Sequence, residues 1–208
     1  MPFNKTITVA LTGASGMPYA LRLIECLLAA QCRVYVLTSQ ASAVVAKQEM
    51  DFILPARAQE LQAFLIQHFK AAAEQLQVFG REEWFAPIAS GSNPPDAMVV
   101  CPCTMSTLAT IAAGLADHLI GRAADVVIKE GRTLILVPRE TPFSAIHLEN
   151  MLKLARLGVV ILPANPGFYH HPQSVQDIVD FVVARILDRL SVPHQLLARW
   201  GESASKNL

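Results

Sequence analysis

Short apolar runs recur along the chain, and most are followed by a segment whose apolar residues have helical spacing. Five runs predict strands, at residues 7–11, 33–38, 97–101, 133–137 and 159–162. The helical spacing predicts helices at about 18–30, 117–129, 144–157 and 174–190. It also predicts a helix that begins near Ser39 and continues beyond Lys47, and another that includes Leu108 and Ala112. Strands that are apolar at consecutive positions are typical of a parallel sheet covered on both faces.

Helices between successive strands predict right-handed crossovers, because parallel strands cannot be joined by tight turns. The chain is therefore expected to form an α/β fold, a three-layer α/β/α sandwich with a parallel, doubly wound sheet of the Rossmann or flavodoxin-like kind. The order of the strands does not follow from one sequence.

Two segments interrupt this alternation. Residues 51–95 are long for a crossover, and they contain an amphipathic helix at 61–69, a short apolar piece at 78–79 and a loop with Trp84. The tail from about residue 192 is apolar but has no strand pattern. We expect a single domain over residues 1–208, in which these two segments contact other subunits or cover a site.

The composition is apolar and poor in charge. Hydrophobic residues make up 52% of the 208 residues and charged residues 16%, against about 25% in an average protein. Such a surface is typical of a chain covered by copies of itself, so we expect a homo-oligomer. The net charge is zero without a basic block, which argues against nucleic acid as a partner. With no signal pattern and no apolar run of membrane-spanning length, we expect a cytoplasmic protein.

Four cysteines are present, at positions 26, 32, 101 and 103. In a cytoplasmic chain they are expected to be reduced. Cys101 and Cys103 flank a proline, but no second cysteine pair and no spaced histidine pair complete four zinc ligands. We therefore predict no metal site.

Most residues that directly follow the predicted strands are glycines or polar residues. The residues at these positions are Gly13, Ala14 and Ser15 after the first strand, Ser39 after the second, Thr104, Met105, Ser106 and Thr107 after the third, Arg139 and Glu140 after the fourth, and Asn165 and Tyr169 after the fifth. Because the carboxyl ends of parallel strands meet at one edge of the sheet, we expect a ligand there.

The first of these turns joins a strand to a helix N-terminus, where free amides and the helix dipole favour an anion. Gly13 and Gly16 permit close approach of the backbone, and Ser15 adds a hydroxyl. The loop reads GASG rather than G-x-G-x-x-G, and no acid follows the second strand to hold a ribose. NAD is therefore disfavoured, and a mononucleotide such as FMN fits better.

Several cations stand out in a chain with so few charges. Arg122 and Lys129 are seven residues apart on one predicted helix, and Arg185 lies on the last helix. They are suited to a second anionic ligand, although spacing alone favours ordinary solvated charges. Glu49 and Glu140 are candidates for acid–base chemistry or for surface charge. Trp84, Trp200 and Tyr169 suit an aromatic wall around a cation, or positions in a core or interface.

A set of motifs runs over nearly the whole chain, at residues 12–16, 90–92, 101–109, 122–126, 136–142, 147–151 and 163–169. RETP at 139–142, NM at 150–151 and GFY at 167–169 are specific as a set. On these motifs the chain resembles the flavin prenyltransferase family, the UbiX-type proteins formerly described as aromatic-acid decarboxylases. Members of that family join a dimethylallyl group from dimethylallyl phosphate to N5 and C6 of reduced FMN, without a metal. The prenylated FMN serves a UbiD-type decarboxylase, for example in ubiquinone biosynthesis, and the family forms dodecamers with sites at subunit contacts.

The resemblance implies roles for individual residues. FMN would be held by Gly13, Ala14, Ser15, Ser39, Thr104, Met105, Ser106, Thr107 and Arg139. The prenyl phosphate would be held by Lys129, Glu140, Tyr169 and Arg185, with Arg122 nearby and with Trp84 and Trp200 lining the prenyl side. Ser15 and Glu49 are implied in proton handling, and Lys129, Glu140 and Tyr169 join them as expected catalytic residues. One departure is Thr104, where the family commonly has serine; the threonine keeps the hydroxyl, while the place of the Met105 side chain stays open.

Three other functions are compatible with a fold of this kind. A flavin-dependent cysteine decarboxylase would share the fold, but its P-x-M-N-x-x-M-W segment is absent and the Arg139–Glu140 pair argues against it. A non-catalytic FMN-binding scaffold is disfavoured because the implied catalytic residues are retained. Direct decarboxylation of a hydroxybenzoate has no support, since the residues include no self-sufficient decarboxylation centre.

Overall fold

Six parallel strands form one sheet in the computed structural model, which describes residues 3–50 and 53–197. The strands are β1 (Thr6–Leu11), β2 (Arg33–Thr38), β3 (Leu76–Val78), β4 (Ala97–Cys103), β5 (Thr133–Pro138) and β6 (Val160–Ile161). The helices are α1 (Met17–Ala29), α2 (Gln40–Met50), α3 (Ala58–Phe69), α4 (Met105–Ala112), α5 (Leu119–Lys129), α6 (Ala145–Arg156) and α7 (Val175–Leu190), with the 3-10 turn η1 (Pro87–Ala89).

The strand order is β3-β2-β1-β4-β5-β6. In the middle of the sheet, Val9 of β1 lies opposite Val36 of β2 on one side and Val99 of β4 on the other. The chain winds outward in one direction from β1 and in the other direction from β4. The neighbouring carboxyl ends of β1 and β4 therefore form the topological switch point, which is where doubly wound sheets bind ligands.

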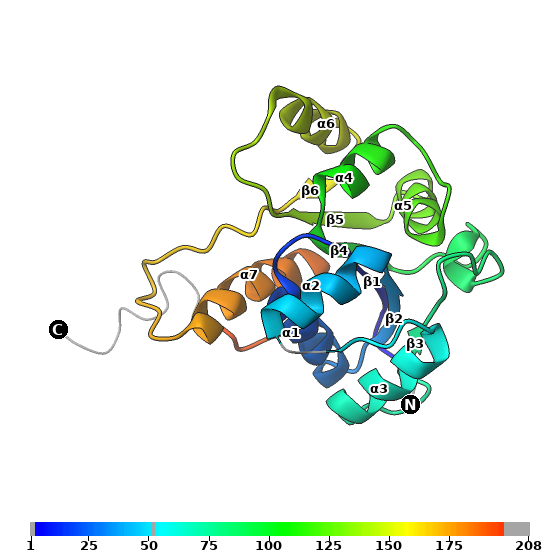
Figure 1. The fold of residues 1–208 in the computed structure, drawn as a ribbon, viewed down its shortest axis with the longest axis horizontal. Coiled ribbons are helices and arrows are strands. Elements are labelled where there is room, and N and C mark those ends of the chain that lie inside the picture. The colour runs from blue at the N-terminus through cyan, green and yellow to red at the C-terminus, as the bar shows by residue number, and fades with distance from the viewer. Residues whose placement is uncertain (1–2, 51–52, 198–208) are drawn as a thin grey trace.

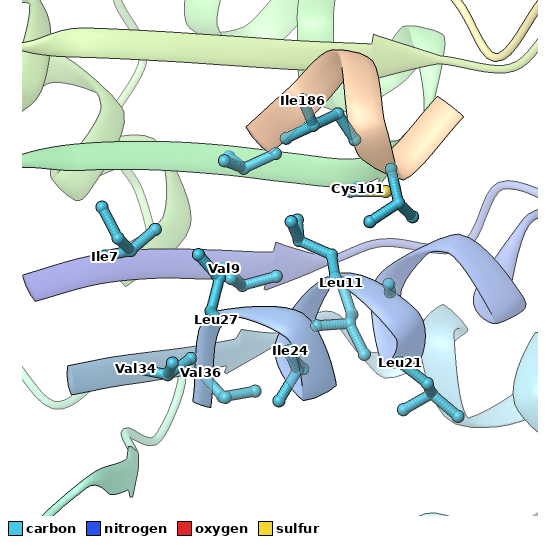
Figure 2. Close-up of a cluster of buried hydrophobic side chains, with 14 of the residues drawn as sticks. Ile7, Val9, Leu11, Leu21, Ile24, Leu27, Val34, Val36, Cys101 and Ile186 are labelled. Carbon is cyan, nitrogen blue, oxygen red and sulfur yellow. The ribbon is translucent and has the colours of Figure 1, made fainter. Parts of the chain in front are cut away.

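Helices cover both faces of the sheet (Figure 1), and successive side chains of the strands pack alternately on the two faces. Ile7, Val9 and Leu11 of β1 belong to a core with α1, α3 and α7, in which Leu27 and Ile186 pack close by (Figure 2). On the other face, Ala10 joins a second core that includes side chains of α4, α5 and α6. Each fully buried aliphatic side chain contributes about 1.5–3 kcal/mol through burial. The predicted three-layer sandwich is confirmed.

The structure differs from the predicted elements mainly in the segment 51–95. Its amphipathic helix is present as α3, but the short apolar piece near Val78 is the edge strand β3, which pairs with β2. The five predicted strands and the remaining helices are present, most of them with ends within one or two residues. Among the helices of the described residues, none has the length and apolar character needed to cross a membrane.

Candidate active site

The N-terminus of α1 is occupied by a carboxylate of the chain itself. Glu49, near the end of α2, accepts hydrogen bonds from the amide of Gly16 at 3.0 and 3.1 Å and from the amide of Met17 at 2.8 Å. These amides lack partners within the helix, and the helix dipole favours an anion beside them. The anion position that the first loop predicts is thus filled by Glu49, and the side chain of Ser15 lies exposed next to it.

Two glycines allow this loop to lie so close to its neighbours. A Cβ on Gly13 would stand 2.3 Å from the Cβ of Ala41 in α2, so α2 packs directly against the loop. Gly16 has a φ of 126°, a conformation that other residues rarely adopt. Because α2 packs against Gly13, the start of α2 lies at the same carboxyl edge of the sheet as Ser15. Ser39 directly precedes α2 and lies at this edge too.

Thr12 connects the loops after β1 and β4. Its buried hydroxyl donates to the carbonyl of Pro102 at 2.7 Å and accepts from the amide of Thr104 at 2.9 Å. The two loops at the switch point therefore hold a fixed spacing. Thr12 is not among the predicted site residues, although it follows a buried strand directly and begins the motif at residues 12–16.

The N-terminus of α4 provides open donors at the same edge. Thr104 caps the helix, since its hydroxyl accepts from the amide of Thr107 at 3.0 Å and donates to the hydroxyl of Thr107 at 2.9 Å. The amides of Met105 and Ser106 precede the first intrahelical bond and point out of the helix. The Met105 side chain is buried in the core beneath α4, so this residue can offer a ligand only its main chain.

Ser39 and Arg139 complete the edge on either side. The amide of Ser39 donates to the carbonyl of Leu11 at 2.9 Å, and the amide of Arg139 donates to the carbonyl of Cys103 at 3.4 Å. The Ser39 hydroxyl is buried and has no hydrogen-bond partner among the described residues. It lines a cavity of about 290 Å³ at the carboxyl ends of β2 and β3. A buried hydroxyl without a partner is costly, and a ligand such as FMN, with its ribityl hydroxyls and phosphate, would satisfy it.

Arg122 and Lys129 lie on α5, and Lys129 ends it only four residues before β5 begins at Thr133. Arg122 donates to the carbonyl of Ala89 at 2.9 Å and pairs with Asp125 at 2.8 Å. Lys129 pairs with Glu130 directly above Gly91. Lys129 therefore lies near the amino ends of the strands, opposite the Ser15 edge of the same chain.

Tyr169 and Arg185 both lie near Phe181 of α7, at the outer edge of the sheet beside β6. The Tyr169 ring contacts Phe181 of α7 edge-on, with 5.8 Å between centroids. Arg185 follows one helical turn later on α7 and pairs with Asp188 at 2.8 Å. Figure 1 shows the segment between β6 and α7 extending away from the sheet. Because β6 lies two strands from β4, roughly 10 Å across the sheet, these residues are separate from the switch point.

The three remaining predicted site residues are Glu140, Trp84 and Trp200. Glu140 accepts a hydrogen bond from the next amide, of Thr141, at 3.2 Å and follows β5 at the carboxyl edge. Trp84 lies in the exposed loop after β3 and is 44% exposed, with a fully exposed Phe85 beside it. Trp200 lies outside the described residues. Within the described residues, the predicted FMN residues lie at the carboxyl edge of the sheet, whereas Lys129, Tyr169 and Arg185 lie away from it.

Cys101 and Cys103 are too deeply buried to act as nucleophiles. All four cysteines are free, and burial raises the pKa of the Cys101 and Cys103 thiols far above the usual range. Both thiols are therefore protonated and poor nucleophiles. Within residues 3–50 and 53–197, no three His, Cys, Asp or Glu side chains gather as a metal site would require.

A doubly wound sheet whose switch point offers hydroxyls and free amides defines a nucleotide-binding α/β protein. The Flavoprotein family model matches residues 2–187. The flavin prenyltransferase UbiX of Pseudomonas aeruginosa is 59% identical over 196 residues, which cover 94% of each chain. The chain belongs to the Flavoprotein family and, within it, to the UbiX flavin prenyltransferases.

Solved structures support the same assignment. The AnUbiX complex with FMN and dimethylallyl pyrophosphate is 37% identical, with a TM-score of 0.84 over 94% of this chain and 97% of that one. A dodecameric, FMN-dependent UbiX-like decarboxylase from Escherichia coli O157:H7 is 41% identical, with a TM-score of 0.82 over 94% and 98%. The cysteine decarboxylase TvaF is only 20% identical over 76% and 88%, with a TM-score of 0.54, and shares the fold alone.

Proposed function

We propose that the chain transfers the dimethylallyl group of dimethylallyl phosphate to N5 and C6 of reduced FMN and releases prenylated FMN. The observation that carries the proposal is the set of donors without partners at the carboxyl ends of β2 and β4, in a chain 59% identical to a flavin prenyltransferase. These donors are the Ser39 hydroxyl and the first amides of α4. The cysteine-decarboxylase alternative is not favoured, because its similarity extends to the fold alone.

In this proposal the phosphate of FMN binds at the N-terminus of α4. The α1 amides cannot hold it, because the Glu49 carboxylate already accepts their hydrogen bonds and would repel a second anion. The α4 amides of Met105 and Ser106 are open, and the Thr104 and Thr107 hydroxyls stand beside them. Arg139, on the neighbouring strand end, adds positive charge. Ser39 then lies on the opposite side of the crevice, where its hydroxyl meets the ribityl chain.

Bound as the reduced form, FMN supplies two nucleophilic positions, N5 and C6. Ser15 and Glu49 are proposed to handle the proton that N5 loses when the prenyl carbon bonds to it. Glu49 is suited to this role because three hydrogen bonds from two amides fix its carboxylate. Ser15, which is exposed and directly precedes Gly16 in the chain, is proposed to relay the proton to that carboxylate.

The donor is proposed to bind between copies of the chain. Tyr169 and Arg185 would hold its phosphate together with Arg122, Lys129 and Glu140, and Trp84 and Trp200 would line the prenyl group. Of the described residues in this group, Glu140 lies at the carboxyl edge, whereas Lys129, Tyr169 and Arg185 lie away from the flavin edge of the same chain, so neighbouring subunits would supply them. We propose a homo-oligomer for this reason, with the dodecamer of the Escherichia coli relative as its form.

The product is proposed to serve a UbiD-type decarboxylase, since a modified flavin is released rather than consumed. A cytoplasmic location fits the free state of all four cysteines, because the cytoplasm keeps thiols reduced.

The deciding experiment combines the protein, reduced FMN and dimethylallyl phosphate without oxygen and then determines the mass of the flavin. We expect a gain of one prenyl unit. A flavin of unchanged mass would overturn the proposal. Release of carbon dioxide from an aromatic acid by this protein alone would support direct decarboxylation in its place.

A further inference from the structure

The aromatic ring of Tyr19, in the first turn of α1, lies directly against Gly16. A Cβ built on Gly16 would stand 2.8 and 3.3 Å from Cδ2 and Cε2 of that ring and 3.4 Å from the side chain of Pro102. The carbonyl of Gly16 accepts a hydrogen bond from the amide of Tyr19 at 3.1 Å. The ring and the proline therefore fill the space in which a side chain at position 16 would lie.

This packing holds a flexible residue in an uncommon conformation. Gly16 has a φ of 126°, and glycine leaves such a conformation at little cost unless its surroundings prevent it. Pro102 is itself fixed, because its carbonyl accepts a hydrogen bond from the Thr12 hydroxyl at 2.7 Å. Tyr19 is held on its other side by the core that contains Leu11. The direction of the Gly16 backbone thus depends on the ring beside it.

The backbone beside the ring provides the donors that bind Glu49. The amide of Gly16 donates to both carboxylate oxygens of Glu49, at 3.1 and 3.0 Å, and the amide of Met17 donates to one of them at 2.8 Å. Catalytic groups work only where packing and hydrogen bonds hold them in position, and a displacement of about 1 Å can cost about 10²-fold in rate. A shift of Gly16 would therefore displace the carboxylate.

The hydroxyl of Tyr19 does not explain this arrangement. It makes no hydrogen bond with another residue within 3–50 and 53–197. Burial raises the pKa of this hydroxyl, and the nearby Cys101 and Glu49 raise it further. The phenol is therefore neutral at physiological pH and adds no charge beside the carboxylate. What Tyr19 contributes to Glu49 comes from its ring.

We propose that Tyr19 is a positioning residue for prenyl transfer. Its ring holds Gly16 so that the amides of Gly16 and Met17 keep the Glu49 carboxylate in place. The inference rests on the proposed function, in which Glu49 helps to handle the proton that N5 of the flavin loses. Tyr19 acts on the reaction through Glu49 and needs no contact with FMN or with the donor.

The first test compares Tyr19→Leu, which removes the ring, with Tyr19→Phe, which keeps it. We expect Tyr19→Leu to lower the single-turnover rate of prenylation about tenfold or more and Tyr19→Phe to stay within about twofold of wild type. Tyr35→Leu is the matched control, because Tyr35 packs on Phe79 in the core on the other face of the sheet. It should lower the urea midpoint as Tyr19→Leu does, yet keep the wild-type rate. If Tyr19→Leu does not fold, Tyr19→Met takes its place with the same expectation.

A double variant shows whether the effect passes through Glu49. In a Glu49→Gln protein, Tyr19→Leu should lower the rate no more than about twofold further, because residues that act as one unit are not additive. The inference is overturned if Tyr19→Leu lowers the rate of Glu49→Gln by the same factor as that of wild type. It is also overturned if Tyr19→Leu has the wild-type rate, or if Tyr19→Phe loses as much as Tyr19→Leu.

A second readout does not depend on activity. Hydrogen exchange, followed by mass spectrometry on peptides covering residues 12–18, reports on the amides that bind Glu49. We expect exchange of the Gly16 and Met17 amides to be about tenfold faster in Tyr19→Leu and unchanged in Tyr35→Leu. Equal exchange in Tyr19→Leu and wild type would contradict the inference. A wild-type protein that does not prenylate FMN would instead overturn the proposed function, and the exchange rates would still decide whether Tyr19 holds these amides.

Discussion

Glu49 shows how a single residue acquires its place from a long-range contact. From the sequence it was a candidate for acid–base chemistry or a surface charge. The structure places its carboxylate on the amides of Gly16 and Met17, 33 and 32 residues away in the chain. Nothing local to Glu49 predicts this contact, because it depends on α2 packing against the first loop. The same contact decides which helix N-terminus is free for the flavin phosphate.

We predict that Glu49→Gln lowers the rate of flavin prenylation by about 10²-fold or more, the usual contribution of a positioned proton acceptor. The amide can still accept hydrogen bonds from Gly16 and Met17, so FMN binding should persist. The measurement is single-turnover prenylation together with flavin absorbance. Glu60→Gln, an exposed carboxylate on α3, is the control. If Glu49→Gln prenylates FMN at the wild-type rate, Glu49 takes no part in the proton transfer.

Tyr169 and Arg185 offer a prediction that separates the two ligands. Tyr169→Phe and Arg185→Ala should retain FMN absorbance, because both residues are remote from the switch point. Both should raise the KM for dimethylallyl phosphate, by about tenfold where a charged hydrogen bond is lost. Titration of each variant with FMN and with the donor measures the two effects. Loss of FMN would mean that these residues belong to the flavin pocket instead.

At the scale of secondary-structure elements, the sequence predicts those helices and strands that have a clear local pattern of apolar residues. The central strands are continuous apolar runs, so β1, β2, β4 and β5 were found close to their observed limits. The strand β3 has only three residues, Leu76–Val78, and only its pairing with β2 identifies it as part of the sheet. The strand order was not predictable because it depends on pairing between distant segments. The predicted FMN residues share one edge because they follow strands that are adjacent.

The close packing of α2 against the first loop gives a prediction about Gly13. In Gly13→Ala the new Cβ would stand 2.3 Å from the Cβ of Ala41, so α2 must move together with Ser39 and Glu49. We expect a loss of about 1–3 kcal/mol in the free energy of unfolding, as overpacking typically costs, and weaker FMN binding. Urea unfolding and flavin titration measure the two effects.

Gly80→Ala is the matched control for this contact, because a Cβ there would meet nothing closer than 3.6 Å. It should leave both stability and FMN binding near wild type. Equal behaviour of the two variants would show that the approach of α2 to the loop at Gly13 is not tight in solution.

At the scale of the whole molecule, the single chain presents three separate groups of candidate residues. The FMN residues lie at the switch point, Lys129 lies near the amino ends of the strands, and Tyr169 lies at the outer edge. Large apolar side chains are exposed on the surface of the described chain, including Phe85 at 103% and Phe168 at 65%. Exposed aromatic residues of this kind mark protein–protein contacts. The low charge of the composition leads to the expectation of a homo-oligomer, and these exposed side chains support it. The residues that each copy would supply could be separated only once the fold was known.

This separation predicts that two inactive variants can restore each other. Ser15→Ala impairs the flavin edge and Arg185→Ala impairs the donor group, so each should be weakly active alone. In an oligomer assembled from an equal mixture of the two chains, some sites combine the intact flavin edge of one chain with the intact Arg185 of its neighbour. We expect roughly a quarter of wild-type activity after unfolding and refolding the mixture, the statistical share when each site draws on two copies. Mixing without unfolding is the control and should give no recovery. If every site were built within one chain, each would carry a defect and the refolded mixture would stay as inactive as its parts.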